Sequence, residues 1–338
     1  MKEAMLYEKL SDAKVKCNLC NHRCTIKDGS FGICGVRQNV EGSLNTLVYD
    51  RIIASHIDPI EKKPLFQFYP GSRAYSIATV GCNFKCKHCQ NADISQLPVE
   101  RKGYVAGEKM GPVEIAEAAH SSGCQSIAYT YTEPTIFFEL AYETSRRACD
   151  SGIKNLFVSN GYMSPEALEK IAPYLDGINI DLKAFTEEFY KEICGARLAP
   201  VLDTIRLAKN LGIWVEVTTL VIPTLNDSED ELRQIAEFLR DVDVSIPWHI
   251  SQFYPTYQMT NLPRTPIETL HKAREIGREI GLHYVYEGNV PGRGNENTYC
   301  HQCGALLIER WGYSIIKNTI NDGRCPSCEA PVAGVGLS

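Results

Sequence analysis

The chain alternates short runs of apolar and β-branched residues with longer stretches in which apolar residues recur every three or four positions. The short runs predict strands buried on both faces, and the longer stretches predict amphipathic helices that cover a parallel sheet. This pattern predicts an α/β fold, a full or partial TIM-like (β/α) barrel. The expected strands are 74–80, 126–131, 155–159, 177–182, 214–221 and 249–253, with a candidate seventh at 283–286.

Two of the intervening helices have clear boundary signals. Ser228 and Glu231 form a capping box ahead of apolar residues with helical spacing at 232–239. Pro200 suits the first turn of another helix. Because the chemistry of such barrels lies at the C-terminal ends of the strands, residues that follow strands are the candidates for a site.

Composition narrows the class of protein. Of 338 residues, 44% are hydrophobic, which is enough for a sizeable core, and the formal net charge of -6 does not favour nucleic-acid binding. The N-terminal MKEAMLYEKL lacks the apolar segment of a signal peptide, and no run approaches the roughly 18 apolar residues of a membrane span. We therefore expect a cytoplasmic protein without a membrane partner.

Eleven of the fourteen cysteines fall into three groups, which in a reducing compartment indicate metal ligation rather than disulfides. The groups divide the chain into an N-terminal four-cysteine segment (1–72), a barrel (73–295) and a C-terminal appendage (296–338). Cys124, Cys149 and Cys194 lie outside the groups and are expected to be free, buried thiols. The groups are Cys17, Cys20, Cys24 and Cys34; Cys82, Cys86 and Cys89; and Cys300, Cys303, Cys325 and Cys328.

The middle group forms a CxxxCxxC sequence directly after the first expected strand. Three thiolates can hold three irons of a [4Fe-4S] cluster and leave the fourth iron open to a substrate or cofactor. A zinc site completed by His88 is the alternative, although a loop at the active face of a barrel is an unusual place for structural zinc.

This loop, with the aromatic Phe84 between its first two cysteines, resembles that of the radical S-adenosylmethionine (SAM) superfamily. Over nearly its whole length the chain is similar to the radical SAM enzymes of the AmmeMemoRadiSam system, which are relatives of pyruvate formate-lyase activating enzyme. The strings that carry the resemblance are HIDPIEKKPLFQFYPGS, GCNFKCKHCQN, YTEPTIFFE, SNGY, DGINIDLKAF, TTLVIPTLND, PWHISQFYP and YEGN.

The resemblance implies that a [4Fe-4S] cluster on Cys82, Cys86 and Cys89 reductively cleaves SAM, and that the resulting 5′-deoxyadenosyl radical abstracts hydrogen from an organic substrate. It also implies an external electron donor and partner proteins of the Memo and AMMECR types.

Asn179, Asp181 and Lys183 are two residues apart along an expected strand, so their side chains should project together into the barrel. The resemblance implies that Lys183 helps to hold the carboxylate of SAM and that Asp181 lies near the cofactor. A structural ion pair between these two residues is the alternative.

Two further positions match cofactor-binding elements of the family. Glu133 stands where a GGE-type element binds the ammonium of SAM, although Thr132-Glu133-Pro134 lacks both glycines. A carboxylate in the first turn of a helix would also explain Glu133. Asn160, followed by Gly161, could bond a ribose or a carboxylate, and an ordinary turn is the alternative.

Polar residues at the later strand ends are candidates for a wall that contacts the substrate. His249 could equally be a hydrogen-bonded core histidine. The basic run at 62–64 either caps the mouth of the barrel or forms a solvated turn. The candidate wall residues are Thr218, His249, Gln252, Tyr254 and Asn289.

The outer cysteine groups predict two more metal sites. The C-terminal CxxC…CxxC has nearly the spacing of a zinc ribbon, with a β-hairpin expected within 305–320, and zinc is favoured over iron. The N-terminal group, with His22 as a substitute ligand, suits structural zinc or an auxiliary [4Fe-4S] cluster that relays electrons. Free buried cysteines are the third reading of that group.

Together these features predict a radical SAM enzyme of the oxidoreductase type. A small-molecule substrate is slightly favoured, because the sequence shows no dedicated insert for docking a protein loop. A glycyl residue of a partner protein is the alternative substrate. A non-catalytic iron-sulfur and zinc scaffold is the alternative of another class, but it would not need Glu133, Asp181 and Lys183 at strand ends.

Overall fold

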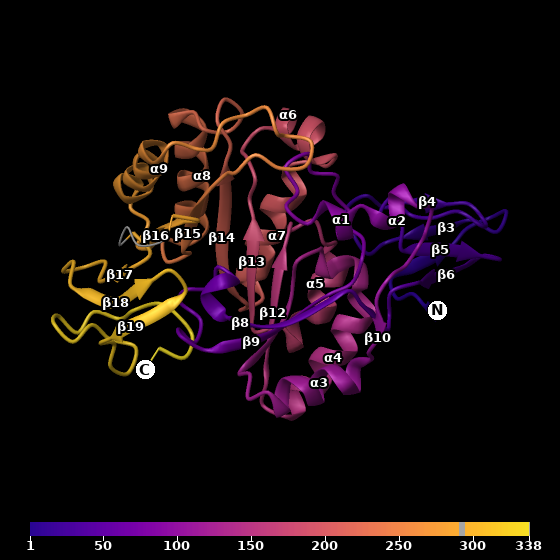
Figure 1. The fold of residues 1–338 in the computed structure, drawn as a ribbon, viewed down its shortest axis with the longest axis horizontal. Coiled ribbons are helices and arrows are strands. Elements are labelled where there is room, and N and C mark those ends of the chain that lie inside the picture. The colour runs from indigo at the N-terminus through magenta and orange to yellow at the C-terminus, as the bar shows by residue number, and fades with distance from the viewer. Residues whose placement is uncertain (291–294, 338) are drawn as a thin grey trace.

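The computed structural model describes residues 1–290 and 295–337. Its centre is an eight-stranded sheet in the order β16-β15-β14-β13-β12-β11-β9-β8 (Figure 1). Seven strands are parallel, and β8 (Ala54–Pro59) joins β9 antiparallel. Among the described residues β16 and β8 are not paired with each other, so the fold is a partial barrel. The parallel strands are β9 (Arg73–Ala78), β11 (Ser126–Tyr129), β12 (Lys154–Ser159), β13 (Gly177–Asp181), β14 (Trp214–Val221), β15 (Trp248–Gln252) and β16 (Val285–Gly288).

All seven expected strands are present, with shifted ends. The first ends at Ala78 rather than at residue 80, and the seventh begins two residues later than expected, at Val285. Most positions on the inner strands are buried; in β13 Gly177 to Ile180 are buried in succession. This continuous burial explains why the sequence shows apolar runs rather than strict alternation.

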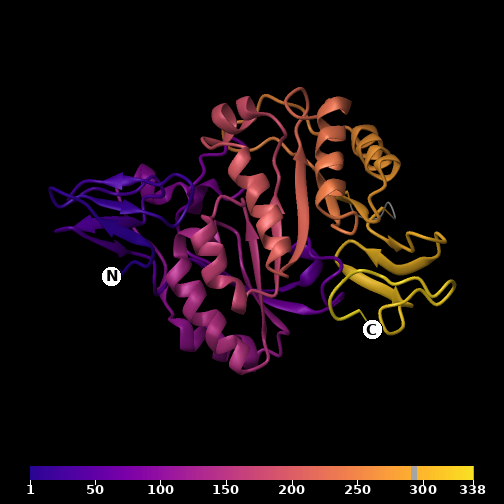
Figure 2. The same ribbon diagram turned by 180° about the vertical axis from the view of Figure 1, so that it is seen from behind.

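Helices cover one face of the sheet (Figure 2). Helix α8 begins where expected, because the Ser228 hydroxyl accepts a hydrogen bond from the backbone N–H of Glu231. The expected capping box is incomplete, since the Glu231 carboxylate accepts the N–H of Phe185 instead of that of Ser228. Pro200 lies in the first turn of α7, where a missing N–H has no cost. The helices are α3 (Pro112–Ser121), α4 (Phe138–Asp150), α5 (Pro165–Ile171), α7 (Ala199–Asn210), α8 (Glu229–Val242) and α9 (Ile267–Ile280).

The register of the parallel strands brings their C-terminal ends to one edge of the sheet. Ser159 of β12 lies opposite Ile180 of β13, Asp181 lies opposite Thr218 of β14, and Thr218 lies opposite His249 of β15. Side chains that are far apart in the sequence therefore meet at this edge, as expected for a barrel whose site follows its strands.

The N-terminal segment forms small antiparallel sheets and also supplies β8 to the central sheet. Its strands are β1 (Lys2–Glu3), β2 (Tyr7–Lys9), β3 (Val15–Cys17), β4 (Thr25–Ile26), β5 (Arg37–Val40), β6 (Ser43–Thr46) and β7 (Arg51–Ile52), the last paired with β10 (Glu108–Lys109). The short helical segments are η1 (Ile60–Lys62), α1 (Ala92–Ser95), α2 (Leu97–Glu100), η2 (Pro134–Phe137), η3 (Ala172–Tyr174), α6 (Glu187–Phe189) and the π-helical η4 (Tyr190–Cys194).

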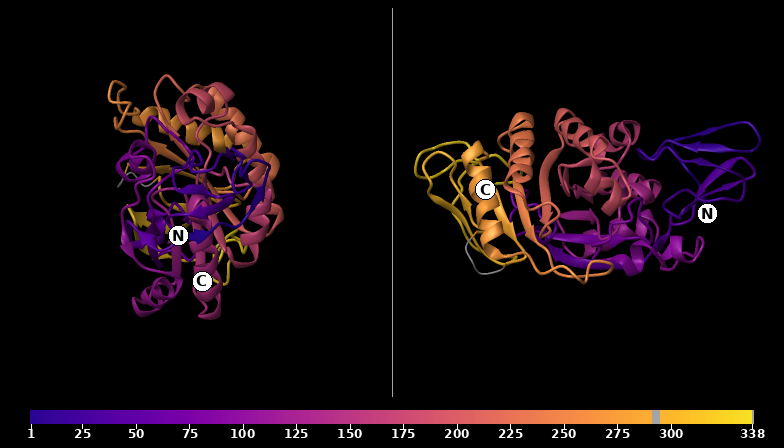
Figure 3. Two further views of the ribbon diagram at one scale, coloured as in Figure 1. Left: turned by 90° about the vertical axis from the view of Figure 1, so that its right-hand side faces the viewer. Right: turned by 90° about the horizontal axis from the view of Figure 1, so that it is seen from above.

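The C-terminal residues form a three-stranded sheet of β17 (Thr298–Tyr299), β18 (Leu306–Trp311) and β19 (Ser314–Asn318), which contains the expected hairpin. This sheet lies at one end of the molecule, and the N-terminal sheets lie at the other (Figures 1 and 3). Its apolar core is shared with the barrel, since Leu307 and Ile308 pack in one cluster with Phe66, Tyr284 and Tyr286.

None of the helices in the two described stretches is both long and apolar enough to cross a membrane.

Candidate active site

A cavity of about 560 Å³ opens at the C-terminal ends of the parallel strands. Its wall is built from the loop after β9, from the ends of β11 to β16 and from the segment between β8 and β9. The structure thereby brings together most of the residues that the sequence singled out. The lining includes Cys82, Cys86, Cys89, Glu133, Asn160, Asp181, Lys183, Thr218, His249 and Asn289.

The three-cysteine loop is held against neighbouring backbone. The N–H groups of Lys85 and Lys87 donate to the carbonyls of Cys194 and Ile193 at 2.8 and 3.0 Å, and the Gln96 amide donates to the Phe84 carbonyl at 3.1 Å. Among the described residues, the three thiols are not part of any cluster of three or more ligand atoms within 4.8 Å of one another. This wider spacing fits the separate corners of an iron-sulfur cube better than a single tetrahedral ion.

Cys194 is a feature of the site that sequence reasoning missed. Of the three cysteines expected to be free and buried, Cys149 is exposed, whereas Cys124 and Cys194 are buried. Cys194 ends the π-helical segment η4, and its thiol hydrogen-bonds Cys86. That hydrogen bond lowers the pKa of Cys86, although burial and Asp181 oppose it. Cys194 does not line the cavity, so it supports Cys86 from behind the wall.

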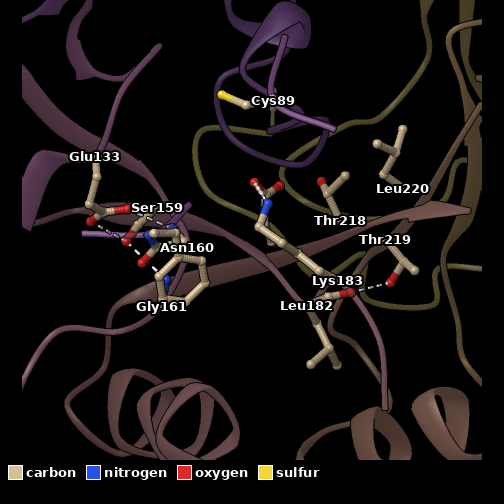
Figure 4. Close-up of polar contacts among 12 residues, drawn as sticks. Cys89, Glu133, Ser159, Asn160, Gly161, Leu182, Lys183, Thr218, Thr219 and Leu220 are labelled. Carbon is tan, nitrogen blue, oxygen red and sulfur yellow. Dashed lines mark hydrogen bonds and ion pairs between the residues drawn. The ribbon is translucent and has the colours of Figure 1, made fainter. Parts of the chain in front are cut away.

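Glu133 presents a buried carboxylate beside the cysteine loop (Figure 4). One oxygen accepts hydrogen bonds from the backbone and hydroxyl of Thr135 and from the Ser159 hydroxyl, and the other accepts from the Asn160 N–H at 2.8 Å. All four donors are uncharged. Burial raises the pKa of Glu133, and these hydrogen bonds counteract the rise. A buried carboxylate with neutral partners is prepared to bind a cation.

Glu133 also has the alternative role expected for it, that of a carboxylate at the start of a helical segment. Its side chain accepts the N–H of Thr135 as the N-cap of η2, so the carboxylate caps a helical segment and faces the cavity at the same time.

Lys183 projects from the end of β13 toward the cysteine loop (Figure 4). Its ammonium lies 2.8 Å from Asp181. Burial would lower the pKa of Lys183, but Asp181 and the thiols of Cys86 and Cys194 raise it well above its usual value. Lys183 is therefore a cation in the cavity wall. The ion pair expected as the structural alternative is formed, and both partners line the cavity.

The amide of Asn160 is largely occupied by the protein. Its NH₂ group donates to the side chain of Asn83 at 2.7 Å, and its carbonyl oxygen accepts from the Tyr162 N–H at 3.1 Å. Gly161 follows with a φ of +70°, and a Cβ there would lie 2.7 Å from Ile180. The expected turn is thus present, and it places Asn160 in the cavity wall.

His88 was considered in the sequence only as a zinc ligand, but it lines the cavity. Burial, helped by Lys183, lowers its pKa to about 3, so the ring is neutral. Its Nδ1 atom has no hydrogen-bond partner in the described structure. A buried imidazole nitrogen without a partner is a ready contact for a bound ligand.

Three of the five candidate substrate residues line the cavity. Thr218 donates to Asn179 at 2.9 Å, and Asn289 donates to the Gln252 carbonyl at 3.1 Å. His249 hydrogen-bonds Glu216 at 2.6 Å and packs between Phe66 and Tyr286, which is the arrangement of a core histidine whose ring edge reaches the cavity.

Gln252 and Tyr254 do not line the cavity. Gln252 is buried against the Thr265 carbonyl and Arg264, and the Tyr254 hydroxyl donates to the Asn289 carbonyl at 3.3 Å. Both residues hydrogen-bond Asn289, so they support the wall from behind without lining the cavity.

The basic run at 62–64 is not a solvated turn. Lys63 is buried, lies 2.6 Å from Asp58, and sits over the ring of Tyr131, whose hydroxyl also donates to Asp58. Lys62 binds the other oxygen of Asp58 at 2.8 Å and is more exposed. Burial would raise the pKa of Asp58, but these three hydrogen bonds hold it well below its usual value. Both lysines line the cavity, so the run contributes to its mouth.

The C-terminal cysteines form a compact set. Cys300 lies 3.6 Å from Cys328, Cys303 lies 3.7 Å from Cys325, and all four sulfur atoms lie within 4.8 Å of one another. Four thiolates around one zinc at about 2.3 Å are separated by about 3.8 Å, so this set fits a single tetrahedral ion.

The N-terminal cysteines are also gathered. Burial and the neighbouring thiols of Cys17, Cys34 and Cys24 raise the pKa of Cys20. The four residues therefore lie near one another, but among the described residues no three of their sulfur atoms lie within 4.8 Å of one another, unlike the C-terminal set.

Comparison with known proteins agrees with this geometry. Residues 76–239 match the Radical SAM superfamily. An uncharacterized protein of Methanocaldococcus jannaschii is 49% identical over 331 residues, covering 97% of this chain and 98% of that protein. A putative glycyl-radical enzyme activating enzyme of the same organism is 27% identical over 245 residues, covering 71% of this chain and 86% of the relative.

The fold is shared with solved structures. A radical SAM methyltransferase from Sphaerobacter thermophilus superposes with a TM-score of 0.50 at 15% identity, covering 71% of each chain. The matched sequence, the shared fold and the three-cysteine loop at the mouth of a partial barrel lead to one assignment. This chain belongs to the radical SAM superfamily.

Proposed function

We propose that this chain cleaves SAM reductively and uses the 5′-deoxyadenosyl radical to abstract hydrogen from an organic substrate. The observation that carries the proposal is the meeting of three kinds of group in one cavity: three thiols, the buried carboxylate of Glu133 and the ammonium of Lys183. A non-catalytic scaffold would not need the two charged groups there.

The residues fit the cofactors that the family uses. Cys82, Cys86 and Cys89 would hold a [4Fe-4S] cluster, which supplies the electron for SAM cleavage when it is bound. Glu133 accepts the ammonium of the methionine moiety, because its four partners leave its negative charge uncompensated. Lys183, after the end of β13, offers its cation to the methionine carboxylate. The two groups orient a zwitterion between them.

The rest of the cavity serves the substrate. Thr218, His249 and Asn289 line it on the side of β14 to β16, and Lys62 and Lys63 lie at its mouth. The first candidate is a small-molecule substrate, which would share the cavity of about 560 Å³ with the cluster and SAM. The relative named as a putative glycyl-radical enzyme activating enzyme supports a second candidate, a glycyl residue of a partner protein.

Three finer assignments belong to this proposal. The compact Cys300, Cys303, Cys325 and Cys328 set binds structural zinc. An external protein supplies the electron. Proteins of the Memo and AMMECR types are the candidate partners that the sequence resemblance implies.

The test is the formation of 5′-deoxyadenosine by the anaerobic protein with reductant and SAM. We expect wild type and the control Cys149→Ala, which changes an exposed thiol outside the three groups, to form the nucleoside. Cys86→Ala should form none. Product formation that survives Cys86→Ala would contradict the proposal, and so would a wild-type protein with a full iron content that forms no product.

A further inference from the structure

The N-terminal cysteine group lies directly against the catalytic loop. Cys34 approaches Gly81, the residue before Cys82, so closely that a Cβ on Gly81 would lie 3.2 Å from the Cys34 carbonyl and 2.8 Å from Val36. Because neighbouring Cα atoms are about 3.8 Å apart, Cys82 begins one residue beyond this contact.

A second contact joins the same two regions. His22, between Cys20 and Cys24, hydrogen-bonds the backbone carbonyl of Asn83 at 2.8 Å, and Asn83 follows Cys82. The N-terminal site therefore contacts the catalytic loop on both sides of its first cysteine.

A third contact fixes Cys20 against the barrel. Cys20 forms a β-bridge with Met163 in the loop after β12, and the Asn21 N–H donates to the Tyr162 carbonyl at 3.0 Å. This is the loop that holds Asn160 in the cavity wall. The N-terminal site is thus fixed in position relative to the catalytic cysteines.

The spacing of the thiols distinguishes this site from the C-terminal one. Within the described residues, no three of the four N-terminal thiols lie within 4.8 Å of one another, whereas all four C-terminal thiols do. A single ion would draw four thiolates together, while a cubane cluster separates them onto its corners.

A buried cation stands beside these thiols. Arg37 is ion-paired to Glu139 at 2.5 Å through one nitrogen, while its Nε and Nη1 are buried without a hydrogen-bond partner in the described structure. The guanidinium interacts electrostatically with Cys17 and Cys34. Unpaired buried donors are costly, so they indicate an acceptor that is missing from the protein alone. The sulfur atoms of an anionic cluster would satisfy them.

We infer that Cys17, Cys20, Cys24 and Cys34 hold a second [4Fe-4S] cluster, which passes one electron at a time from an external donor to the catalytic cysteine loop. This inference rests on the proposed function. The donor is a one-electron protein reductant of the flavodoxin or ferredoxin class. In each transfer the donor is oxidised by one electron, the N-terminal cluster is reduced and then reoxidised, and the catalytic cluster is reduced by one electron. Cys24, the least buried of the four, marks the side of entry.

Metal content of the anaerobically reconstituted holoenzyme is the first measurement. We expect about eight iron and about one zinc per chain. The double variant Cys17→Ser/Cys34→Ser should lose about four iron and keep its zinc. The matched control Cys300→Ser/Cys328→Ser should lose the zinc and keep the iron. About four iron and two zinc in wild type would overturn the inference, and so would a loss of iron in the control instead.

Electron delivery is the second measurement. In Cys17→Ser/Cys34→Ser, 5′-deoxyadenosine formation with reduced flavodoxin should fall at least tenfold more than formation with dithionite, which reduces the catalytic cluster directly. An equal fall with both reductants would overturn the relay. The proposed function is judged separately by Cys86→Ala, since a zinc-filled N-terminal site would leave SAM cleavage in wild type intact.

Discussion

At the scale of single residues, Cys194 shows how a side chain outside the cavity can influence a thiol inside it, that of Cys86, which we propose as a cluster ligand. Its thiol hydrogen-bonds Cys86 and lowers the pKa of that thiol. Hydrogen bonds to ligand sulfur atoms are among the factors that set the potential of an iron-sulfur cluster. Cys194 is therefore a positioning residue, and it must not be a fourth ligand if the cluster is to bind SAM.

We expect Cys194→Ala to keep the wild-type iron content and to shift the midpoint potential of the catalytic cluster to a more negative value, because a donor to sulfur is lost. Redox titration monitored by electron paramagnetic resonance measures the shift. Cys124→Ala is the matched control, since Cys124 is also buried but lies between α3 and β11. Loss of iron in Cys194→Ala alone would make Cys194 a ligand and contradict this view.

Glu133 leads to a prediction about pH. Burial raises its pKa, against its hydrogen bonds, and only the ionised carboxylate attracts an ammonium. SAM affinity should therefore be full at high pH and fall as the pH drops through the raised pKa, above the usual Glu value near 4.3. Equilibrium dialysis at a series of pH values from pH 8 downward would follow the change.

Glu133→Gln provides the comparison. It should weaken SAM binding about ten- to a hundredfold at pH 8, as expected from the ~1.5–3 kcal/mol of a hydrogen bond to a charged group, and the remaining affinity should not depend on pH in this range. The control Glu188→Gln alters an exposed carboxylate away from the cavity. A wild-type pH profile in Glu133→Gln would assign the titration to another group.

At the scale of elements, the sequence predicted what depends on local pattern. The seven parallel strands and the start of α8 could be found because burial on both faces and a capping hydroxyl leave marks in consecutive residues. Strand β8 was missed, because it lies at the edge of the sheet and carries exposed polar residues such as Ser55 and His56. Because Asp58 is its only buried residue, β8 has no apolar run that a sequence pattern could reveal.

The site could be predicted to a similar extent. The cysteines, Glu133 and Lys183 follow strands, so the barrel geometry brings them together. Cys194 and Lys63 could not be placed, since their positions depend on a π-helical segment and on a pairing with Asp58. We expected Gln252 in the cavity wall because it ends a strand, but the loop that follows β15 covers it. The strand pattern alone does not show which side chains are covered in this way.

The turn that begins the cysteine loop gives a prediction for Gly81. Its φ is +103°, and a Cβ would lie 2.8 Å from Val36. Gly81→Ala should lower the free energy of unfolding by about 2–4 kcal/mol, from backbone strain and from the forced separation of the N-terminal segment. Gly212→Ala is the control: its φ is +78° with no atom within 4 Å of a Cβ, so it should lose only about 1 kcal/mol. If denaturant unfolding showed the same loss of free energy for both variants, the close approach of Gly81 to Val36 would not contribute to the cost.

At the scale of the whole molecule, the C-terminal sheet is not an independent appendage. The side chain of Arg310, in β18, contacts the segment between β8 and β9. It donates to the Phe66 carbonyl and to the Thr298 hydroxyl, each at 2.8 Å, and its guanidinium lies over the Phe66 ring. From the same sheet, Tyr313 contributes to the cavity wall. The zinc-ribbon-like sheet therefore helps to shape the site, which the spacing of its cysteines did not reveal.

These contacts of Arg310 predict how its substitution changes the free energy of unfolding and the zinc content. Arg310→Met would remove these buried hydrogen bonds and leave Glu61, 3.9 Å away, without this charge, so the free energy of unfolding should fall by about 3–5 kcal/mol. Zinc content should stay at about one per chain, because the four cysteines are untouched. Arg324→Met, which removes an exposed guanidinium that donates to the Glu329 carbonyl within the C-terminal segment, should cost less than about 0.5 kcal/mol. Urea unfolding with parallel zinc analysis measures both. Equal effects of the two substitutions would mean that the sheet holds its place independently of Arg310, and loss of zinc from Arg310→Met would mean that metal binding depends on the contact with the barrel.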